Sequence, residues 1–234
     1  MKVIILAAGV GKRIRGVTKD PKCLIRIKDE PLIVRNIRIL KSYGINSVVV
    51  VSGYKHGKLV KAVRSAGLKV KFIENADYRD GSIISLWRAA EELRGDIVIM
   101  DADLYFEGAL VENIMRSRKN NFFLIDTKAK KDKEAVIVGF KKGRAAVLER
   151  GLRWQSGVCG EWAGFLKLSA AGAAKLRSLI KNKVSLGERK VGYEFIIPEL
   201  FEKITISYEL IDGLKWVEID FPKDLKRAMS LSIN

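Results

Sequence analysis

The residues with the clearest chemical potential stand at the start of the chain, where glycines and cations follow an apolar run. Residues 3–8 are aliphatic or small, Gly9 and Gly11 come next, and Lys12, Arg13 and Lys22 follow. A buried strand that opens into small residues lets backbone N–H groups approach phosphate oxygens, which the cations can neutralise. The pattern therefore predicts a loop that holds a polyphosphate at the end of a strand.

Two common phosphate-binding loops do not fit this stretch. A dinucleotide-binding loop needs a third glycine where the chain has Ile14. A Walker loop needs a glycine at the position of Leu6 and a Ser or Thr at the position of Arg13. A purely structural turn remains the alternative for an isolated Gly-x-Gly.

A second chemical signal is the pair Asp101 and Asp103, directly after the apolar residues 97–100. Ligands of an open α/β sheet bind at the carboxyl ends of its strands, and carboxylates there can hold Mg²⁺ against phosphate oxygens. Acidic residues also end strands as turn formers or helix caps. Together with the glycine loop, the pair favours a metal site.

The string Leu-Ala-Ala-Gly-x-Gly-x-Arg at residues 6–13, followed by Pro21-Lys22, resembles the signature of nucleotidyltransferases that condense an NTP with a phosphorylated sugar or alcohol. The resemblance implies transfer of a nucleoside monophosphate with release of pyrophosphate. In that reaction Lys22 stabilises charge at the α-phosphate and Arg13 holds the leaving pyrophosphate. The other nucleotide contacts that it implies here are Leu6, Ala7, Ala8, Gly9, Gly11 and Lys12.

The same resemblance implies a Mg²⁺ ion on Asp103 and on an acidic residue late in the chain. Asp220, which ends the strand-like residues 216–219, fits that place, with Asp101 as a further metal partner. We expect Glu218 to face the other side of its strand. Asp224 suits the first turn of a terminal helix, where the helix dipole favours a negative charge.

Residues 74–86 resemble the nucleobase-contacting stretch of the CTP-dependent branch, with Asn75, Gly81, Ser82 and Ser85 as the implied contacts. CTP is therefore the expected nucleotide. Ser82 is also a good N-cap residue, which explains it without any ligand.

Residues 160–169, with Gly164 among them, resemble the acceptor side of cytidylyltransferases that act on phosphocholine-like or aminoalkylphosphonate substrates, and inositol phosphate stays open as another acceptor. Aromatic and acidic side chains could form a cage for a cationic amine, namely Trp154, Glu161, Trp162, Tyr193 and Glu194. For each aromatic residue taken singly, packing in the core is an equally good interpretation.

The elements that must position these residues follow from apolar periodicity. The first hundred residues alternate strands (residues 3–8, 47–51, 70–74 and 97–100) with helices (residues 31–43, a second one marked by Leu59, Val60 and Val63 and closed by Gly67, and residues 82–93). This alternation predicts an α/β fold with a Rossmann-like, doubly wound and mostly parallel sheet. In the second half, short strands with a turn at residues 141–143 predict a small β-rich acceptor region, followed by helices at residues 170–181, 193–202 and from Pro222 on.

Composition sets the remaining bounds. The 234 residues suit one domain over 1–234, and the net charge of +17 indicates anionic partners. The cations are spread along the chain, and the basic run 128–133 suits a solvated loop, so no nucleic-acid arm is expected. High charge with little Gln or Cys would suit a thermophile. No further enzyme is expected after the last helix.

The spacing of the cysteines and the apolar start of the chain indicate the cellular compartment. Cys23 and Cys159 lie far apart, so neither a disulfide framework nor a zinc site is expected. Residues 3–8 are too few for a membrane span or a signal peptide, and we expect a cytoplasmic protein. His56, the only histidine, is expected in a solvated loop without a catalytic role.

Three alternatives stay open. The acceptor could be a hexose 1-phosphate used with another NTP. Asp-x-Asp after a strand also occurs in glycosyltransferases, although the loop cations would then have no triphosphate to hold. A basic nucleic-acid-binding module is the non-enzymatic alternative.

Overall fold

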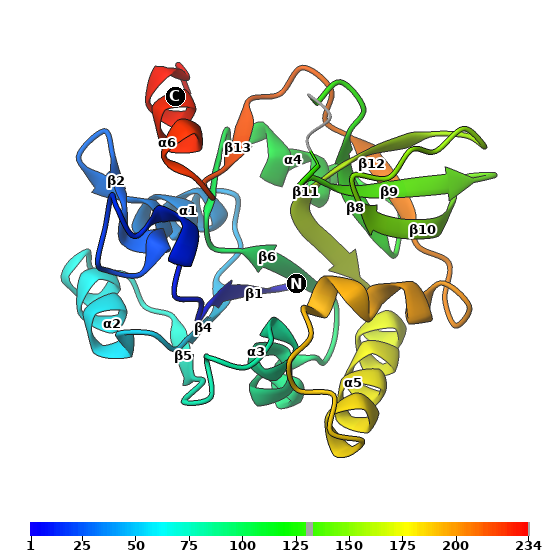
Figure 1. The fold of residues 1–234 in the computed structure, drawn as a ribbon, viewed down its shortest axis with the longest axis horizontal. Coiled ribbons are helices and arrows are strands. Elements are labelled where there is room, and N and C mark those ends of the chain that lie inside the picture. The colour runs from blue at the N-terminus through cyan, green and yellow to red at the C-terminus, as the bar shows by residue number, and fades with distance from the viewer. Residues whose placement is uncertain (130–132, 234) are drawn as a thin grey trace.

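The structure is a computed structural model that describes residues 1–129 and 133–233. Its centre is a parallel sheet in the strand order β5 (Lys71–Glu74), β4 (Ser47–Ser52), β1 (Lys2–Ala7) and β6 (Ile97–Asp101) (Figure 1). Val3, Ile4 and Ile5 in β1 are completely buried, as expected for a strand covered on both faces. The predicted doubly wound, mostly parallel sheet is confirmed.

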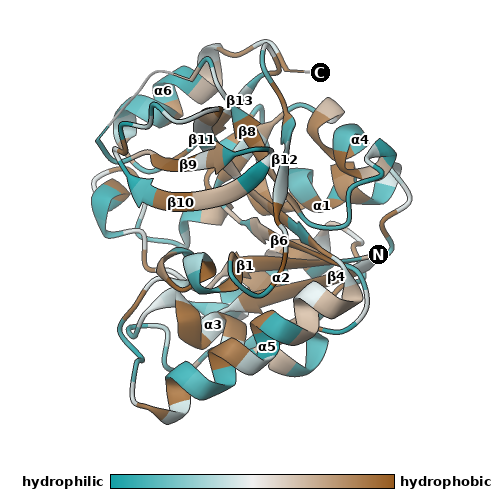
Figure 2. Cartoon of the chain, turned by 90° about the vertical axis from the view of Figure 1, so that its right-hand side faces the viewer, coloured by the Kyte–Doolittle hydropathy of each residue, from teal (hydrophilic) through white to brown (hydrophobic). Residues whose placement is uncertain are grey.

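Helices cover both faces of this sheet. Apolar side chains of α3 (Ser82–Arg88) and α5 (Ala170–Ser185) join one hydrophobic cluster with Ile4 and Ile99. Those of α1 (Leu32–Ser42), α2 (His56–Ser65) and α4 (Ala109–Arg116) join another cluster with Val3 and Ile5. Figure 2 shows the brown strands β1 and β6 between α3 and α5 on one side and α1 and α4 on the other.

Antiparallel strands extend the sheet beyond β6. The long strand β11 (Cys159–Leu168) pairs with β6, then with β8 (Phe122–Asp126) and β9 (Val136–Lys141). Strand β10 (Arg144–Arg150) forms a hairpin with β9, and β12 (Ser207–Leu210) pairs parallel to β8. Lys142 and Gly143 take φ values of 50° and 75°, which suit a tight hairpin turn. The predicted β-rich region is confirmed.

Two small sheets flank the main one. Strand β7 (Leu104–Phe106) pairs with β13 (Trp216–Glu218), and β2 (Arg26–Ile27) pairs with β3 (Glu30–Pro31). The terminal helix α6 (Pro222–Ser230) packs through Ala228 and Leu225 against a third apolar cluster that contains Ile14 and Val217. The C-terminal segment is therefore docked beside the segment that follows β1.

Several predicted elements differ in detail. Residues 193–202 form two 3₁₀ turns, Tyr193–Phe195 and Ile197–Leu200, instead of one α-helix, because Pro198 cannot donate a backbone hydrogen bond. Helix α3 ends at Arg88 and a 3₁₀ turn, Ala90–Glu92, completes the segment.

His56 is not in a solvated loop. It begins α2 half-buried, and its Nδ1 atom lies 2.6 Å from the Ser52 hydroxyl oxygen. Part of the basic run 128–133 lies outside the described residues. Among the residues that are described, no helix is long and apolar enough to cross a membrane. Cys23 and Cys159 are both free thiols.

Candidate active site

A cleft of about 530 Å³ opens at the carboxyl ends of β1 and β6. It brings together most of the residues that the sequence singled out. Those that line it are Leu6, Ala7, Ala8, Gly9, Gly11, Lys12, Arg13, Lys22, Gly81, Ser82, Ser85, Asp101, Asp103, Trp162, Gly164, Tyr193, Glu194 and Asp220. Asn75, Trp154 and Glu161 do not line it.

The loop after β1 depends on Gly11. This residue has a φ of 63° and begins the 3₁₀ turn Lys12–Ile14, a backbone conformation that favours glycine. A Cβ atom on Gly11 would lie 3.2 Å from the Cβ atom of Lys22. Glycine at this position therefore lets the loop pass close to Lys22, the predicted catalytic residue.

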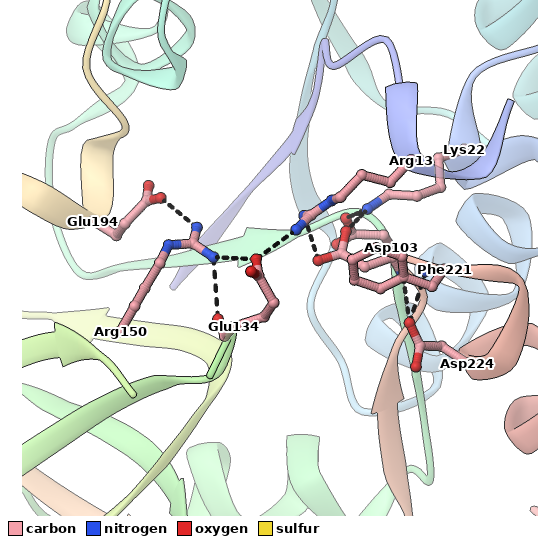
Figure 3. A network of polar contacts seen from close by, with 9 residues as sticks. Arg13, Lys22, Asp103, Glu134, Arg150, Glu194, Phe221 and Asp224 are labelled. Carbon is pink, nitrogen blue, oxygen red and sulfur yellow. Dashed lines mark hydrogen bonds and ion pairs between the residues drawn. The ribbon is translucent and has the colours of Figure 1, made fainter. Parts of the chain in front are cut away.

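Lys22 is held between two carboxylates. Its Nζ atom lies 2.6 Å from Asp220 Oδ1. It also pairs with Asp103 Oδ2, and Figure 3 shows Lys22 and Asp103 side by side. Burial alone would lower the pKa of Lys22, but Asp103, Asp220 and Glu218 attract its charge and raise the pKa above the ordinary value. Lys22 is therefore a fixed cation at this end of the cleft.

Three carboxylates gather around this lysine. Oxygen atoms of Asp103, Glu218 and Asp220 all lie within 4.8 Å of one another. Asp103 Oδ1 is buried and has no hydrogen-bond partner within residues 1–129 and 133–233. A cluster of three carboxylates, one of them with a buried and unpartnered oxygen, suits a hard divalent cation, so the donor set fits Mg²⁺.

The expectation that Glu218 faces away from the site is wrong. Val217 and Ile219 are buried in the cluster beneath α6, and the Ile219 N–H donates to the carbonyl oxygen of Asp103. Because side chains alternate along a strand, Glu218 and Asp220 share the opposite face, toward the cleft. Burial and the charges of Asp103 and Asp220 raise the pKa of Glu218 well above its ordinary value.

The position of Asp220 is set by the start of α6. The Asp224 carboxylate accepts hydrogen bonds from the backbone N–H groups of Phe221, at 2.7 Å, and Asp220, at 3.1 Å. Pro222 occupies the first turn, where it costs no hydrogen bond. The prediction for Asp224 is confirmed, and the cap also holds the backbone of a cleft residue.

Asp101 does not belong to the carboxylate cluster. Its two oxygens accept hydrogen bonds from the hydroxyl of Tyr193, at 3.1 and 3.0 Å. Burial, followed by the charges of Asp103 and Glu194, raises the pKa of Asp101 well above its ordinary value. In this structure Asp101 is paired with Tyr193, and its part in metal binding stays a prediction.

The predicted base-contacting residues are joined to a segment from much later in the chain. Gly81 donates its N–H to the carbonyl of Arg189, and an added Cβ would lie 1.9 Å from the carbonyl oxygen of Val191. The Ser82 hydroxyl accepts from the Tyr193 N–H at 2.8 Å, so Ser82 is not the N-cap of α3, a position that Gly81 takes.

Asn75 lies behind the residues that line this side of the cleft. It is buried, and its Nδ2 atom donates to the Ser85 hydroxyl at 3.1 Å. This hydrogen bond fixes the hydroxyl of Ser85, which does line the cleft, and a direct contact of Asn75 with the base stays a prediction.

The predicted aromatic and acidic cage forms only in part. Trp162 and Tyr193 line the cleft, but they pack edge to face at 5.7 Å and are only 5% and 4% exposed. Trp154 packs on Gly139 and donates to the Phe140 carbonyl. Glu161 precedes Trp162 in β11 and therefore faces the opposite side.

The structure adds cleft residues that the sequence analysis did not name as contacts, although Tyr78 and Asp80 lie within its predicted base-contacting stretch: Cys23, Tyr78, Asp80, Ala102, Glu134, Val136, Arg150 and Glu218. Among them, Glu134 bridges Arg13 and Arg150, and Arg150 pairs with Glu194 (Figure 3). Glu218 also had a signal in the sequence, because it lies two residues before Asp220 and side chains alternate along a strand.

Comparisons with known proteins agree with this geometry. Residues 3–186 match the MobA-like NTP transferase domain. The chain is 30% identical over 247 residues to a choline-phosphate cytidylyltransferase of Streptococcus pneumoniae, covering 100% of this chain and 99% of that protein. It is 25% identical to a bifunctional IPC transferase and DIPP synthase of Thermococcus kodakarensis, and there it spans 99% of its own length but only 50% of the relative's.

Solved structures share the fold. A CTP:phosphocholine cytidylyltransferase from Streptococcus pneumoniae has a TM-score of 0.78 at 23% identity, with 97% of each chain covered. An inositol-1-phosphate CTP transferase from T. maritima has a TM-score of 0.81 at 17% identity, covering 100% of this chain and 97% of that one. With its glycine loop, its paired lysine and its carboxylate cluster in one cleft, the chain belongs to the MobA-like NTP transferase family and is a nucleotidyltransferase.

Proposed function

We propose that this protein transfers a cytidylyl group from CTP to a phosphorylated small alcohol and releases pyrophosphate, with residues 1–234 acting as one domain. The observation that carries the proposal is Lys22 held between Asp103 and Asp220 at the end of the glycine loop. A cation and a metal-binding carboxylate pair at one point suit a reaction centred on a phosphorus atom. CTP is favoured because the relatives named above include cytidylyltransferases of similar length.

The proposed reaction is a single in-line displacement. An oxygen of the acceptor phosphate forms a bond to the α-phosphorus of CTP while the bond from that phosphorus to the bridging oxygen of pyrophosphate breaks. A phosphate oxygen is already nucleophilic at neutral pH, so no covalent enzyme intermediate is required, and catalysis consists of positioning and charge neutralisation.

Each part of the cleft has a role in this reaction. Backbone groups of Gly9 and Gly11 and the side chains of Lys12 and Arg13 would bind the triphosphate. Lys22 would contact the α-phosphate. The base would lie against Gly81, Ser82 and Ser85.

Asp103, Glu218 and Asp220 would hold Mg²⁺, which supplies charge neutralisation at phosphate oxygens when bound. The Lys22 ammonium already pairs with two of these three carboxylates. It would leave them for the substrate phosphates once the site is loaded.

The test is pyrophosphate release with Mg²⁺ for CTP, UTP, GTP and ATP against phosphocholine, phosphoethanolamine, aminoethylphosphonate, inositol 1-phosphate and glucose 1-phosphate. We expect turnover with CTP and an alcohol phosphate, and none in EDTA. Turnover only with another NTP and glucose 1-phosphate would overturn the proposed specificity. No release with any pair, together with salt-sensitive retention of oligonucleotides, would favour a nucleic-acid-binding protein.

A further inference from the structure

A line of alternating charges crosses the cleft away from the carboxylate cluster (Figure 3). Arg13 pairs with Glu134 at 3.0 Å, Glu134 with Arg150 at 3.6 Å, and Arg150 with Glu194 at 3.2 Å. Arg150 also donates to the backbone carbonyl of Glu134 at 3.1 Å. The guanidinium of Arg150 is therefore held between two carboxylates, with all three side chains lining the cleft.

Among the described residues, Arg150 makes no ion pair with the carboxylate cluster. Two residues, Arg13 and Glu134, stand between it and Asp220 in the line of ion pairs. The reacting phosphates are expected beside Lys22 and Asp220. Arg150 and Glu194 are thus placed to contact the part of the acceptor that lies away from its phosphate.

The chemistry of this end does not suit a quaternary ammonium group. Such a group binds to open aromatic faces, but Trp162 and Tyr193 are almost completely buried and pack on each other. The exposed ring of Phe195 does not line the cleft, and the Arg150 guanidinium lies over it, 5.9 Å from its centroid. The Trp162 Nε1 atom donates to the Phe165 carbonyl, and the Tyr193 hydroxyl donates to Asp101. A trimethylammonium group also has no hydrogen-bond donor or acceptor with which to replace the contacts of a displaced Arg150–Glu194 pair.

Hydroxyl groups of a ligand suit the part of the cleft beside Arg150 and Glu194. A hydroxyl can accept from the guanidinium of Arg150 and donate to a carboxylate of Glu194 or Glu134, so the ion pair can be opened and its partners satisfied by one ligand. Resting on the proposed function, we propose that Arg150, with Glu194, is the specificity-determining group of the acceptor site. It selects a phosphorylated alcohol that carries further hydroxyl groups over one that carries a quaternary ammonium.

The experiment compares kcat and KM for inositol 1-phosphate and phosphocholine, with CTP, in the native enzyme and in Arg150→Ala. We expect the native enzyme to favour inositol 1-phosphate. In Arg150→Ala the KM for inositol 1-phosphate rises about 10- to 100-fold, as for the loss of hydrogen bonds to a charged group. The KM for CTP and the kcat/KM for phosphocholine stay within about twofold.

Two further variants serve as controls. Arg144→Ala removes an exposed arginine from the other end of β10, away from the cleft, and is expected to change neither KM. Arg150→Lys keeps the charge and the aliphatic stem but loses the guanidinium fork, so it tests the proposal if the alanine variant does not fold. It should raise the KM for inositol 1-phosphate in the same direction.

Preference of the native enzyme for phosphocholine, or an equal loss for both acceptors in the Arg150 variants, would overturn the role of Arg150. So would a rise in the KM for CTP, which would place Arg150 on the nucleotide. All these outcomes leave cytidylyl transfer intact, whereas absence of pyrophosphate release from every pair would refute the proposed function itself.

Discussion

The Nζ atom of Lys22 lies 2.6 Å from Oδ1 of Asp220, a residue 198 positions later in the chain. The same ammonium pairs with Asp103, so one lysine neutralises two acidic residues of the cleft. Lys22, the cation of the proposed reaction, is therefore bound directly to Asp103 and Asp220, two of the proposed metal ligands.

Lys22→Ala should reduce kcat for pyrophosphate release by about two to three orders of magnitude, because a preorganised cation at the α-phosphate is lost. The measurement is steady-state turnover, with circular dichroism to confirm the fold. Lys61→Ala, on an exposed face of α2, is the matched control and should keep full turnover. Near-normal turnover of Lys22→Ala would contradict the assignment.

Removal of Lys22 should also make stability depend on divalent cations. The variant leaves Asp103, Glu218 and Asp220 close together without their internal cation, which destabilises the fold. We expect a lower melting temperature than that of the native protein in EDTA, and recovery of most of the difference in Mg²⁺. A variant whose melting temperature ignores Mg²⁺ would argue against cation binding at this cluster.

Glu218→Gln should weaken divalent-cation binding by about tenfold or more, since a charged ligand is replaced by a neutral one. Mn²⁺ titration followed by electron paramagnetic resonance measures the affinity directly, without turnover. Glu202→Gln, an exposed change outside the cleft, should bind Mn²⁺ as the native protein does. Equal affinities in both variants would exclude Glu218 from the site.

Gly81→Ala should destabilise the protein by about 1–3 kcal/mol, because the new methyl group would overlap backbone atoms of Val191 that cannot easily move. Urea denaturation gives the free energy of unfolding. Gly57→Ala is the control: its methyl group meets nothing within 4 Å, and its stability should be unchanged or slightly higher. A fully stable Gly81→Ala would show that residues 189–193 can shift away.

Asp224→Ala should cost about 1 kcal/mol of stability through the lost cap and should also lower kcat, because the Asp220 backbone loses an anchor. Asp224→Asn retains an acceptor oxygen and should stay close to the native protein in both measurements. If the alanine variant loses stability but keeps its kcat, the cap does not position Asp220.

The sequence predicts the central sheet well, because strands such as β1 and β4 are continuous apolar runs and glycines such as Gly44 and Gly67 end the helices between them. The phosphate loop, Lys22, Asp103 and Asp220 are also predicted, since the resemblance rests on short local strings. Glu218 could have been predicted from strand alternation with Asp220 and was not.

Other cleft residues depend on long-range contacts that local patterns do not record. Glu134 meets Arg13 across 121 positions, and Arg150 meets Glu194 across 44. The Ser82 hydroxyl accepts from the Tyr193 N–H, 111 positions away, and Gly81 takes the N-cap position of α3. Trp154 and Trp162 look alike in the sequence, and only the sheet decides that one packs on Gly139 and the other lines the cleft.

The docking of α6 beside the loop after β1 has a consequence for biosynthesis. A ribosome releases the parallel strands and the loop cations first, and Glu218 and Asp220 emerge about two hundred residues later, long enough for the early strands to pair. A nascent chain that lacks this last segment carries Lys22 without one of its acidic partners. The carboxylate cluster and its pairing with Lys22 can therefore be complete only after residue 220 has been made, so the electrostatic arrangement of the cleft forms late in biosynthesis.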